Sequence, residues 1–544
     1  MTMGQFFRKL RRVGALLIIA IVPVVGLLGL LSFARAAEVR SEGDFLCVKP
    51  GGGDGCQAFI NDALALAHEQ DIIRVAAGLY TENILINQTV TLEGGWNPTF
   101  TIRDIDTFSS TIVPANNTLP VVRIQGTFGS PGDIAPTLEG FEITGGRADL
   151  GGNHGGGVQI IDSNALVISN SIHHNAAFLL GGGVWVQRGG PMLQGNRIAH
   201  NQTAGLGQEA FGGGVQLENS QATLMGNTIA QNVVDGTESY GGGLAISGQG
   251  AAPVTLQQNV IISNVAGLSP AGGFGGAIYL SGGATNCCRV TSQGDRFQTN
   301  HAALGGGLYN DGQILAIDDG IIISNTADSN GGGFLIGTGG MFSLTNSVAI
   351  ANVAGNDGGA IYSSGSISLT NTTLSGNEAA GQGGAIANFD STFLLNATIA
   401  DNGSPSGAGL MNASLVTVQN SLIAENDGDN CLGGLFSLGN NLEDGVTCAL
   451  GQASDQNNTA ADIGGLGDNG GGTATHALMA GSPAIDAGDN AVCSDVDQRG
   501  VPRPQDGDGD GVAICDIGAY EYQIPIPAAK SIYLPVVMNN SAQR

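Results

Sequence analysis

The sequence is poor in positive charge and in aromatic side chains. Of its 544 residues, 19 are Lys or Arg and 46 are Asp or Glu, so the formal net charge is −27, and aromatic residues make up 5%. No Lys or Arg occurs between Phe297 and Gln498. Nucleic-acid binding needs a basic stripe, and this composition argues against it. An acidic surface suits solubility outside a cell, or divalent cations.

Long apolar runs are equally scarce, and the longest one lies near the N-terminus. A basic segment from Arg8 to Arg12 precedes the apolar run Val13–Leu31, and Ala34-Arg35-Ala36 follows as a small-x-small cleavage site. This order predicts a signal peptide over residues 1–36 and an extracellular or cell-surface location. The alternative is an uncleaved membrane anchor, because 19 apolar residues can just span a bilayer.

Cysteine is limited to eight residues, an even number in a chain predicted to be exported, so disulfide bonds are expected. Three pairs are close in sequence: Cys47–Cys56, Cys431–Cys448 and Cys493–Cys515. Cys287 and Cys288 are adjacent and would form a strained vicinal bridge. None of these spacings is typical of a zinc site.

Glycine, in contrast, is abundant, with 90 residues. Its clusters alternate with runs rich in β-branched residues, which argues against disorder. The recurring unit is Gly-Gly, a small residue and an apolar residue. It begins at Gly155, Gly181, Gly212, Gly241, Gly275, Gly305, Gly331, Gly358, Gly383 and, in degenerate form, Gly407.

A second repeat places a large apolar residue three positions before an Asn. The asparagines are Asn175, Asn201, Asn232, Asn264, Asn300, Asn325, Asn377, Asn402 and Asn426, and at Asn352 the pattern slips, with Ile350 only two positions away. The spacing from Asn to Asn is 24 to 36 residues, which fits one three-strand coil of a parallel β-helix. Stacked coils would align the apolar residues into a core and the asparagines into an amide ladder. Most repeats carry an earlier Asn as well, at positions including Asn196, Asn227, Asn259, Asn371, Asn396 and Asn420.

We therefore predict an all-β chain, a right-handed parallel β-helix solenoid of about ten to fourteen coils over residues 37–430. Helical apolar spacing predicts an amphipathic helix at residues 57–70 that caps the open end of the solenoid. Residues 431–522 are expected to form a small disulfide-stapled C-terminal module. Residues 523–544 form a Pro-rich and then apolar tail, either a final strand or a sorting signal.

These motifs resemble two known families of β-helix proteins. The alternation of Gly-Gly-Ala-Ile with Phe297-Gln298-Thr299-Asn300 resembles chlamydial polymorphic outer-membrane protein repeats. The helix-capped start, with Gly78-Leu79-Tyr80 and Gly94-Gly95-Trp96, is similar to pectate-lyase-like proteins. The resemblance covers roughly residues 45 to 430 and implies the fold much more strongly than any function, since this fold serves many roles.

The C-terminal module resembles the choice-of-anchor Q domain of bacterial surface proteins. The matching segments are residues 482–489 (SPAIDAGD), 497–500 (DQRG), 502–503 (PR) and 516–521 (DIGAYE). The resemblance implies a secreted, surface-associated protein and no particular reaction.

Evidence for catalysis is thin. Pectin-degrading enzymes of this fold combine a carboxylate cluster with a basic residue, and the hydrolases also carry Gly-His-Gly and Arg-x-Lys motifs. This chain has no Arg-x-Lys, its closest His lies in Gly152-Asn153-His154-Gly155, and the carboxylate pair Asp318-Asp319 has no cation nearby in sequence. We identify no catalytic residue.

Two groups of side chains are candidates for metal binding. His174 and His200 each precede a ladder Asn and should stack at about 5 Å, as a solvated pair without an accompanying carboxylate. Asp506, Asp508 and Asp510 alternate with glycines, a spacing that suits Ca²⁺, and Asp516 would complete the site. The alternative is a flexible acidic turn held by Cys493–Cys515.

The sequence thus predicts a non-catalytic secreted or cell-surface β-helix protein for adhesion or surface display. Its partners would be an extracellular glycan or the surface of a host or neighbouring cell, with no nucleic acid, and with a membrane only through an uncleaved leader. Ca²⁺ is the one cofactor expected. The alternative is a polysaccharide lyase or glycoside hydrolase that acts on an extracellular glycan.

Overall fold

A computed structural model describes residues 45–151, 153–248, 253–267, 272–281 and 289–524. The predicted leader, the Cys287–Cys288 pair and most of the predicted tail lie outside these residues. The chain divides into two units, residues 1–45 and 46–544, and the β-helix belongs to the second. Among the described residues, no helix is long and apolar enough to cross a bilayer.

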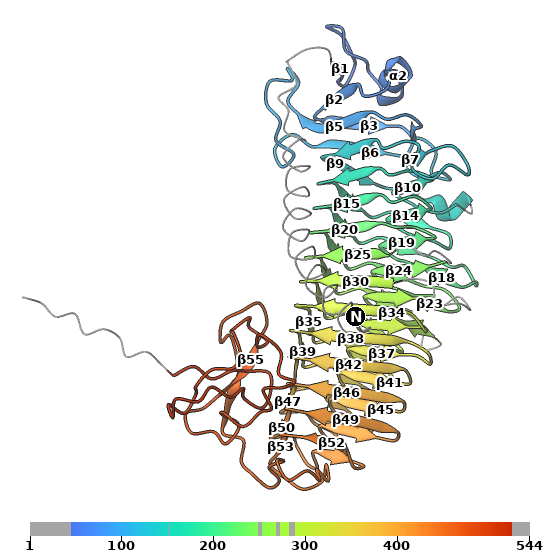
Figure 1. Cartoon of the computed structure of the whole chain (residues 1–544). Coiled ribbons are helices and arrows are strands. Elements are labelled where there is room, and N and C mark those ends of the chain that lie inside the picture. Colours follow the sequence, from blue (N-terminus) through green and yellow to red (C-terminus); the bar gives the residue numbers. More distant parts are fainter. Residues whose placement is uncertain (1–44, 152, 249–252, 268–271, 282–288, 525–544) are drawn as a thin grey trace, which may run out of the picture. The chain divides into compact units, whose positions relative to one another are not determined.

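Three long parallel sheets run side by side along the solenoid (Figure 1). Sheet 1 has 15 strands. They are β1 (Phe45–Val48), β2 (Ile72–Ala76), β5 (Thr91–Trp96), β8 (Thr137–Glu139), β11 (Leu166–Ile168), β15 (Met192–Gln194), β20 (Thr223–Met225), β25 (Val254–Gln257), β30 (Arg289–Gln293), β34 (Ile314–Asp318), β38 (Met341–Thr345), β42 (Ser366–Thr370), β46 (Ser391–Leu395), β49 (Leu415–Gln419) and β52 (Phe436–Gly439).

Sheet 2 has 14 strands and sheet 3 has 13. Sheet 2 consists of β3 (Gly78–Thr81), β6 (Ser110–Val113), β9 (Phe141–Thr144), β12 (Ser171–His173), β16 (Arg197–Ala199), β21 (Thr228–Ala230), β26 (Val260–Ile262), β31 (Arg296–Gln298), β35 (Ile321–Ile323), β39 (Val348–Ile350), β43 (Thr373–Ser375), β47 (Thr398–Ala400), β50 (Leu422–Ala424) and β53 (Leu442–Glu443). Sheet 3 consists of β4 (Ile84–Ile86), β7 (Val122–Gln125), β10 (Val158–Ile161), β14 (Val184–Gln187), β19 (Val215–Glu218), β24 (Leu244–Ser247), β29 (Ile278–Leu280), β33 (Leu308–Asn310), β37 (Phe334–Ile336), β41 (Ile361–Ser363), β45 (Ile386–Asn388), β48 (Leu410–Asn412) and β51 (Cys431–Leu432).

Each coil contributes one strand to each sheet, and equivalent residues of successive coils stand in register. In sheet 2, for example, Ile172 pairs with Ile198, and Ile198 pairs with Ile229. These side chains are fully buried and form one column of a continuous apolar core. The predicted all-β parallel solenoid and its inward apolar stacks are confirmed. The expected slip at Asn352 is absent, because Ala349 occupies the buried position in that column and Ile350 points outward.

The ladder asparagines lie inside the coils, where sheet 2 ends. In each rung, the side-chain oxygen of one Asn accepts from both the backbone N–H and the side-chain NH₂ of the Asn one coil earlier. Asn201, for example, donates from its backbone N and its Nδ2 to Asn232 Oδ1 at 2.9 and 3.1 Å. Asn201 Nδ2 also donates to Ile172 O, 2.9 Å away. One buried amide thus connects three coils and satisfies backbone groups that the corner would otherwise leave unpaired.

The residue before each ladder Asn adopts the left-handed backbone conformation. His174, His200 and Gln231, for instance, have φ of 53°, 55° and 55°. The left-handed residue points its own side chain toward solvent, and the ladder Asn that follows points its side chain into the coil. The left-handed position is therefore the one before the ladder Asn, not the ladder Asn itself.

The Gly-Gly corner before sheet 3 requires glycine for two reasons. Gly181 has a φ of 62°, which side chains with a Cβ rarely adopt. At Gly183 a Cβ would lie 2.7 Å from the carbonyl oxygen of Gly214 in the next coil. The close stacking of coils therefore excludes a side chain at this corner.

Some coils add short strands at their corners. An eight-stranded parallel sheet contains β13 (Ala176–Ala177), β17 (Gln202–Thr203), β22 (Val233–Val234), β27 (Val265–Ala266), β32 (His301–Ala302), β36 (Thr326–Ala327), β40 (Val353–Ala354) and β44 (Glu378–Ala379). Longer insertions form a three-stranded sheet of β18 (Ala210–Phe211), β23 (Ser239–Tyr240) and β28 (Gly273–Phe274). A 3₁₀ helix spans Ala148–Gly151.

Helix α2 (Ile60–Leu66) lies at the N-terminal end of the solenoid and is shorter than the predicted residues 57–70. It buries Ile60, Ala63 and Leu64. Its first turn is held by the Glu82 carboxylate, which accepts from the backbone N–H of Ile60 at 2.7 Å.

At the other end, β51, β52 and β53 continue the three sheets, so the β-helix extends beyond the boundary predicted at residue 430. The disulfide Cys431–Cys448 lies in this final part, and Cys47–Cys56 lies near the first coil. The third predicted pair, Cys493–Cys515, also forms, in the C-terminal module. That module contains the antiparallel pair β54 (Ile463–Gly467) and β55 (Thr475–Leu478) and lies beside the last coils (Figure 1).

Removal of one ladder amide should weaken the solenoid far more than a change one residue earlier. We predict that Asn232→Ala lowers the free energy of unfolding by about 3 kcal/mol, because it leaves buried donors of Asn201 without their acceptor. Urea unfolding followed by circular dichroism measures this change. The matched control is Gln231→Gly, at an exposed left-handed position, which should change stability by less than about 0.5 kcal/mol. Equal effects of the two substitutions would contradict the role of the ladder.

Candidate functional site

The outer face of sheet 1 carries the candidate site, a groove over strands β25 to β49. Alternation along each strand creates it: in β34, Leu315 and Ile317 are buried in the core, while Ala316 and Asp318 face outward. Two hollows of about 380 Å³ each lie on this face and meet at Ser343.

The groove is lined by hydroxyl, amide and apolar side chains. Its hydroxyl groups come from residues that include Thr291, Ser343, Ser368 and Thr417. Met341 and Leu415 are 55% and 50% exposed and supply apolar surface. Asp318 is the one ionisable residue among those that line the two hollows.

A third hollow, of about 520 Å³, lies where the groove meets the C-terminal module. Asn346 lines both this hollow and the neighbouring one. Asp319 lines this hollow from the β-helix, and Arg499 lines it from the C-terminal module. The structure therefore places a cation in the lining of the hollow that Asp319 also lines, although no Lys or Arg is near Asp319 in the sequence.

Two of the charged residues that line this hollow, Asp319 and Arg499, differ in how many interactions they make with other residues. Burial, and then the neighbouring Asp318, raises the pKa of Asp319 above its ordinary value. The Arg499 guanidinium pairs with the Asp497 carboxylate at 2.7 Å and stacks on the Tyr520 ring at 3.5 Å. It also donates to the carbonyl oxygens of Asn469 and Glu521. Arg499 thus has a structural role that competes with any catalytic one.

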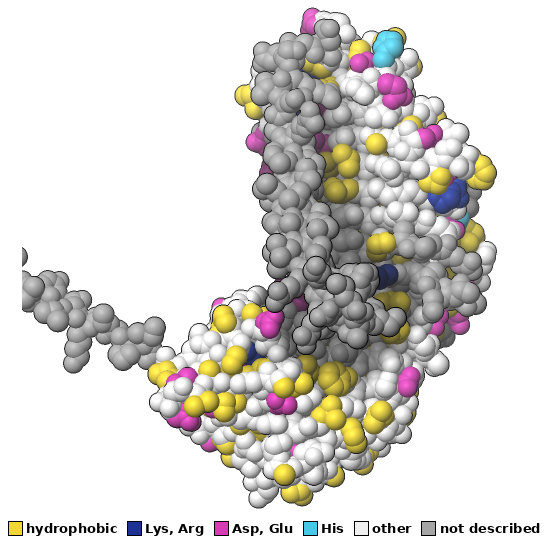
Figure 2. All heavy atoms as spheres, in the orientation of Figure 1, with side chains coloured by type: hydrophobic (Ala, Val, Ile, Leu, Met, Phe, Trp, Pro, Cys, Tyr) yellow, Lys and Arg dark blue, Asp and Glu magenta, His cyan; other side chains and the backbone are white. Residues whose placement is uncertain are grey.

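Few Lys or Arg side chains appear on the face drawn in Figure 2, and apolar side chains gather over the later coils and the module. This view agrees with the absence of Lys and Arg between Phe297 and Gln498.

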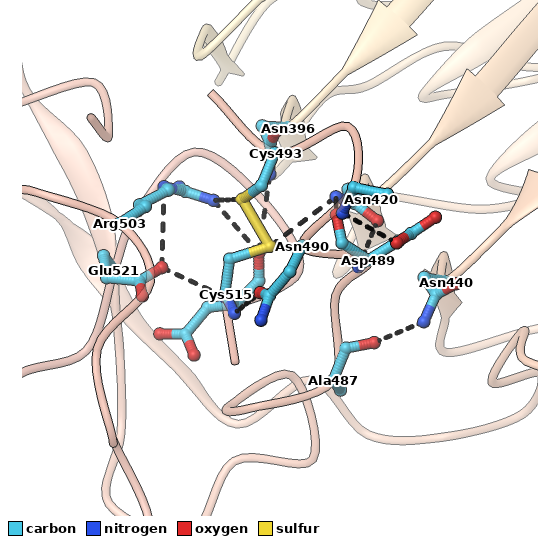
Figure 3. The surroundings of a disulfide bond; sticks show 12 residues. Asn396, Asn420, Asn440, Ala487, Asp489, Asn490, Cys493, Arg503, Cys515 and Glu521 are labelled. Carbon is cyan, nitrogen blue, oxygen red and sulfur yellow. Dashed lines mark hydrogen bonds and ion pairs between the residues drawn. A yellow bond between two sulfur atoms is a disulfide. The ribbon is translucent and has the colours of Figure 1, made fainter. Parts of the chain in front are cut away.

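A column of asparagines on the outside of the β-helix docks the module (Figure 3). Asn371 Nδ2 donates to Val496 O at 2.8 Å, Asn420 Nδ2 to Asp489 O at 3.2 Å, and Asn440 Nδ2 to Ala487 O at 2.9 Å. In return, the backbone N–H of Asp489 donates to Asn420 Oδ1. These are neutral hydrogen bonds, shielded from water by the module itself.

This outer column shows that the earlier asparagines of the repeat have two different roles. Asn196, Asn227 and Asn259 form a second internal ladder, which ends at Asp295. Asn371 and its equivalents in later coils stand one position earlier in the coil, in the left-handed conformation, and point outward. The sequence repeat alone did not separate the two sets.

Residues 497–503 and 516–521 of the module build its buried polar centre. Arg503 is buried and lies 3.5 Å from the Glu521 carboxylate, and it donates to the carbonyl oxygens of Asp516 and Gly518. The module motifs that resemble an anchor domain therefore hold the module together.

The structure divides the predicted calcium ligands. Asp506 and Asp508 lie together with Asp486, their carboxylate oxygens within 4.8 Å of one another. Asp510 lies outside this group and accepts from the backbone N–H of Val512. Asp516 also lies outside it, because it is buried and accepts from the backbone N–H groups of Asp486 and Tyr522. Sequence spacing missed Asp486, which is 20 residues before Asp506.

The remaining candidates from the sequence are three histidines, His174, His200 and His154. His174 and His200 stack with ring centroids 5.1 Å apart, as predicted. His154 packs edge-on against the Trp185 ring, with centroids 5.2 Å apart, and burial lowers its pKa. It is not among the residues that line the groove.

A comparison with protein-family models agrees with the fold. The family described as "Right handed beta helix region" matches residues 128–297. A solved structure titled "Crystal structure of pectate lyase Pel9A" aligns with 11% identity over 89% of this chain and 98% of that chain, with a TM-score of 0.32. No curated protein sequence matches the chain.

Calcium binding, predicted from the sequence for Asp506, Asp508, Asp510 and Asp516, stays a prediction, and the structure changes the candidate ligands to Asp486, Asp506 and Asp508. We predict that millimolar Ca²⁺ raises the melting temperature by a few degrees, because a ligand that binds only the folded state stabilises it. Calorimetry with Ca²⁺ or with chelator measures the shift. Asp508→Asn should abolish it and Asp510→Asn should preserve it. An equal melting temperature with Ca²⁺ and with chelator would exclude the site.

The pH dependence of stability should report the buried Asp516. Burial, with the Glu521 carboxylate beside it, raises the pKa of Asp516 from 3.8 to about 7. The folded state therefore binds a proton that the unfolded chain has lost, and this contribution to stability is complete below about pH 4 and disappears as the pH rises to about 7. We predict that the wild-type melting temperature falls across this interval and that Asp516→Asn reduces the slope. An unchanged slope would contradict the raised pKa.

Proposed function

We propose that this chain is an exported, non-catalytic β-helix protein that binds an extracellular glycan through the groove of sheet 1, in adhesion or surface display. The observation that carries the proposal is the chemistry of the groove. Hydroxyl and amide side chains alternate with apolar ones, which suits the hydroxyl groups and the C–H faces of sugar rings. Asp318 is the one charged group that lines its two central hollows.

The electrostatics favour an uncharged glycan over an acidic one. The whole chain carries a formal net charge of −27, and the groove has no Lys or Arg in its lining. A polyuronate would meet repulsion without a compensating cation. The negative potential of the protein does not repel a neutral polysaccharide, so it does not lower the affinity for one.

Export and surface attachment are further parts of the proposal. They are supported by the leader-like sequence of residues 1–36, by the similarity of the module to choice-of-anchor Q domains, and by three disulfide bonds, which persist in oxidising compartments. The β-helix repeats resemble those of surface proteins, which accords with a role in display.

One observation favours a second candidate, a polysaccharide-cleaving enzyme. The third hollow combines Asp319, whose pKa is raised, with Asp318 next to it in sequence and Arg499 across the hollow. A carboxylic acid and a carboxylate are the groups that glycoside hydrolysis requires. Against this candidate stand the four interactions that already engage Arg499.

A binding and product-release assay separates the two functions. We predict that the purified protein binds a neutral polysaccharide, does not bind polygalacturonate, and releases no reducing sugar or unsaturated product. Ser343→Trp, which fills the point where the two hollows meet, should weaken binding at least about tenfold. The matched control is Thr223→Trp, an outward position of sheet 1 outside the groove lining, which should leave affinity unchanged.

Two results would contradict the proposal. Equal glycan binding by the Ser343→Trp variant and the wild type would place the binding surface elsewhere. Glycan cleavage that is lost in Asp319→Asn would establish the enzymatic alternative.

A further inference from the structure

Four ionisable side chains meet on the outer face of sheet 2, away from the groove and from the module. They are Glu142 on β9, His173 at the end of β12, His174 directly after it, and His200 one coil later. His174 and His200 are exposed, and the His173 side chain is 22% exposed. The sequence pattern indicates the two stacked histidines but no carboxylate beside them. The register of β9 and β12 supplies one, because Ser171 pairs with Glu142 and places it beside the histidines.

Glu142 is held as a carboxylate. One of its oxygens, Oε2, accepts from the hydroxyl groups of Thr111 at 2.7 Å and Ser109 at 3.0 Å. These hydrogen bonds, Thr111 first, lower the pKa of Glu142 below its ordinary value, and His173 contributes in the same direction. The carboxylate is therefore ionised at neutral pH and acts as an acceptor only.

The charged carboxylate selects one tautomer of His173. Glu142 Oε1 lies 3.0 Å from His173 Nε2, so Nε2 carries the proton and donates it to the carboxylate. In the neutral ring, His173 Nδ1 then holds a lone pair. This lone pair accepts a hydrogen bond from His174 Nδ1, 2.8 Å away, and the Thr144 hydroxyl lies 3.3 Å from the same atom. An ion bound to both Nδ1 atoms takes the place of the His174 proton, and the neutral ring of His174 then carries its proton on Nε2.

The left-handed corner brings the second and third imidazoles into the cluster. His174 and His200 have φ of 53° and 55°, and their rings stack with centroids 5.1 Å apart.

We propose that His173 and His174 bind a divalent transition-metal ion such as Zn²⁺ through their Nδ1 atoms, with Glu142 as the residue that positions His173 and with solvent completing the coordination. A ligand histidine that donates its other N–H to a carboxylate is the usual arrangement around such ions. Imidazole ligands select zinc, copper or nickel ions over Ca²⁺ and Mg²⁺, which prefer oxygen.

The distances are suited to an ion between the two rings. Two nitrogens bound at about 2.1 Å to a tetrahedral zinc ion are roughly 3.4 Å apart. The two Nδ1 atoms need to separate by about half an ångström to reach this distance. Because His174 is exposed at a corner, rotation of its side chain provides the movement without disturbance of the core.

The test is isothermal titration of the metal-free full-length protein with ZnCl₂, with and without an excess of Ca²⁺. We expect His173→Ala and His174→Asn to weaken zinc binding by a factor of ten or more. Asn is chosen at position 174 because it tolerates the left-handed backbone. Glu142→Gln, which keeps the shape and removes the charge, should cost about tenfold, and His200→Asn should cost less than His174→Asn.

The matched control is His301→Ala, since His301 is also an outward histidine that contacts a carboxylate, Asp328, at 3.0 Å. It should bind zinc as the wild type does, and excess Ca²⁺ should leave the isotherm unchanged. A Co²⁺ absorption spectrum with imidazole ligands, lost in His174→Asn, gives an independent readout. Absence of zinc binding, or equal binding by His174→Asn and the wild type, would show that the cluster is only a hydrogen-bonded histidine pair.

Discussion

The hydrogen bond from a buried asparagine amide to the backbone of the neighbouring coil is the interaction on which this molecule depends. A corner in a stack of parallel strands leaves N–H and C=O groups that no strand partner reaches, and buried groups of this kind are costly if unpaired. The amide of a ladder Asn, such as Asn201, satisfies them in three coils at once. Because the solution recurs in each coil from Asn175 to Asn426, these coils stack in register, and the apolar columns follow.

The same corner also decides what the outside of the solenoid carries. The residue before each ladder Asn is left-handed and points outward, so its identity can change without cost to the core. In one part of the chain this position holds His174 and His200, and in later coils it holds other residues, most of them polar. At the preceding corner, Asn371 and its equivalents use the outward position to dock the module. The internal ladders thus maintain the fold, while the positions beside them are free to acquire binding roles.

The local features of the fold were predictable from the sequence, because each depends on residues that are close in the sequence or that recur at a regular spacing. The Gly-Gly corners, the ladder asparagines, the inward columns and the three close cysteine pairs all belong to this class. The helix at the N-terminal end was also predicted, although α2 is shorter than its apolar pattern suggested. The end of the β-helix was placed too early, since β51 to β53 continue the three sheets beyond residue 430.

What the sequence did not reveal are contacts between distant segments. Arg499 reaches the hollow of Asp319 from the module, Asp486 joins Asp506 and Asp508, and Glu142 reaches His173 across a coil. No periodicity encodes such pairs, because the register of coils and the docking of the module bring them together. The sequence did not show that Asn371 points outward, for a related reason. A side chain one position earlier at this corner points out of the coil instead of into it, and the repeat pattern has an Asn at either position.

Hydrogen–deuterium exchange at the ladder tests the central claim most directly. Each ladder Asn from Asn175 to Asn402 donates its backbone N–H to the side chain of the next coil. The account predicts that these corner amides exchange as slowly as the amides of the central strands, orders of magnitude more slowly than those of exposed turns. Exchange of the ladder amides at the rate of the exposed turns would show that the buried amides do not hold the coils together.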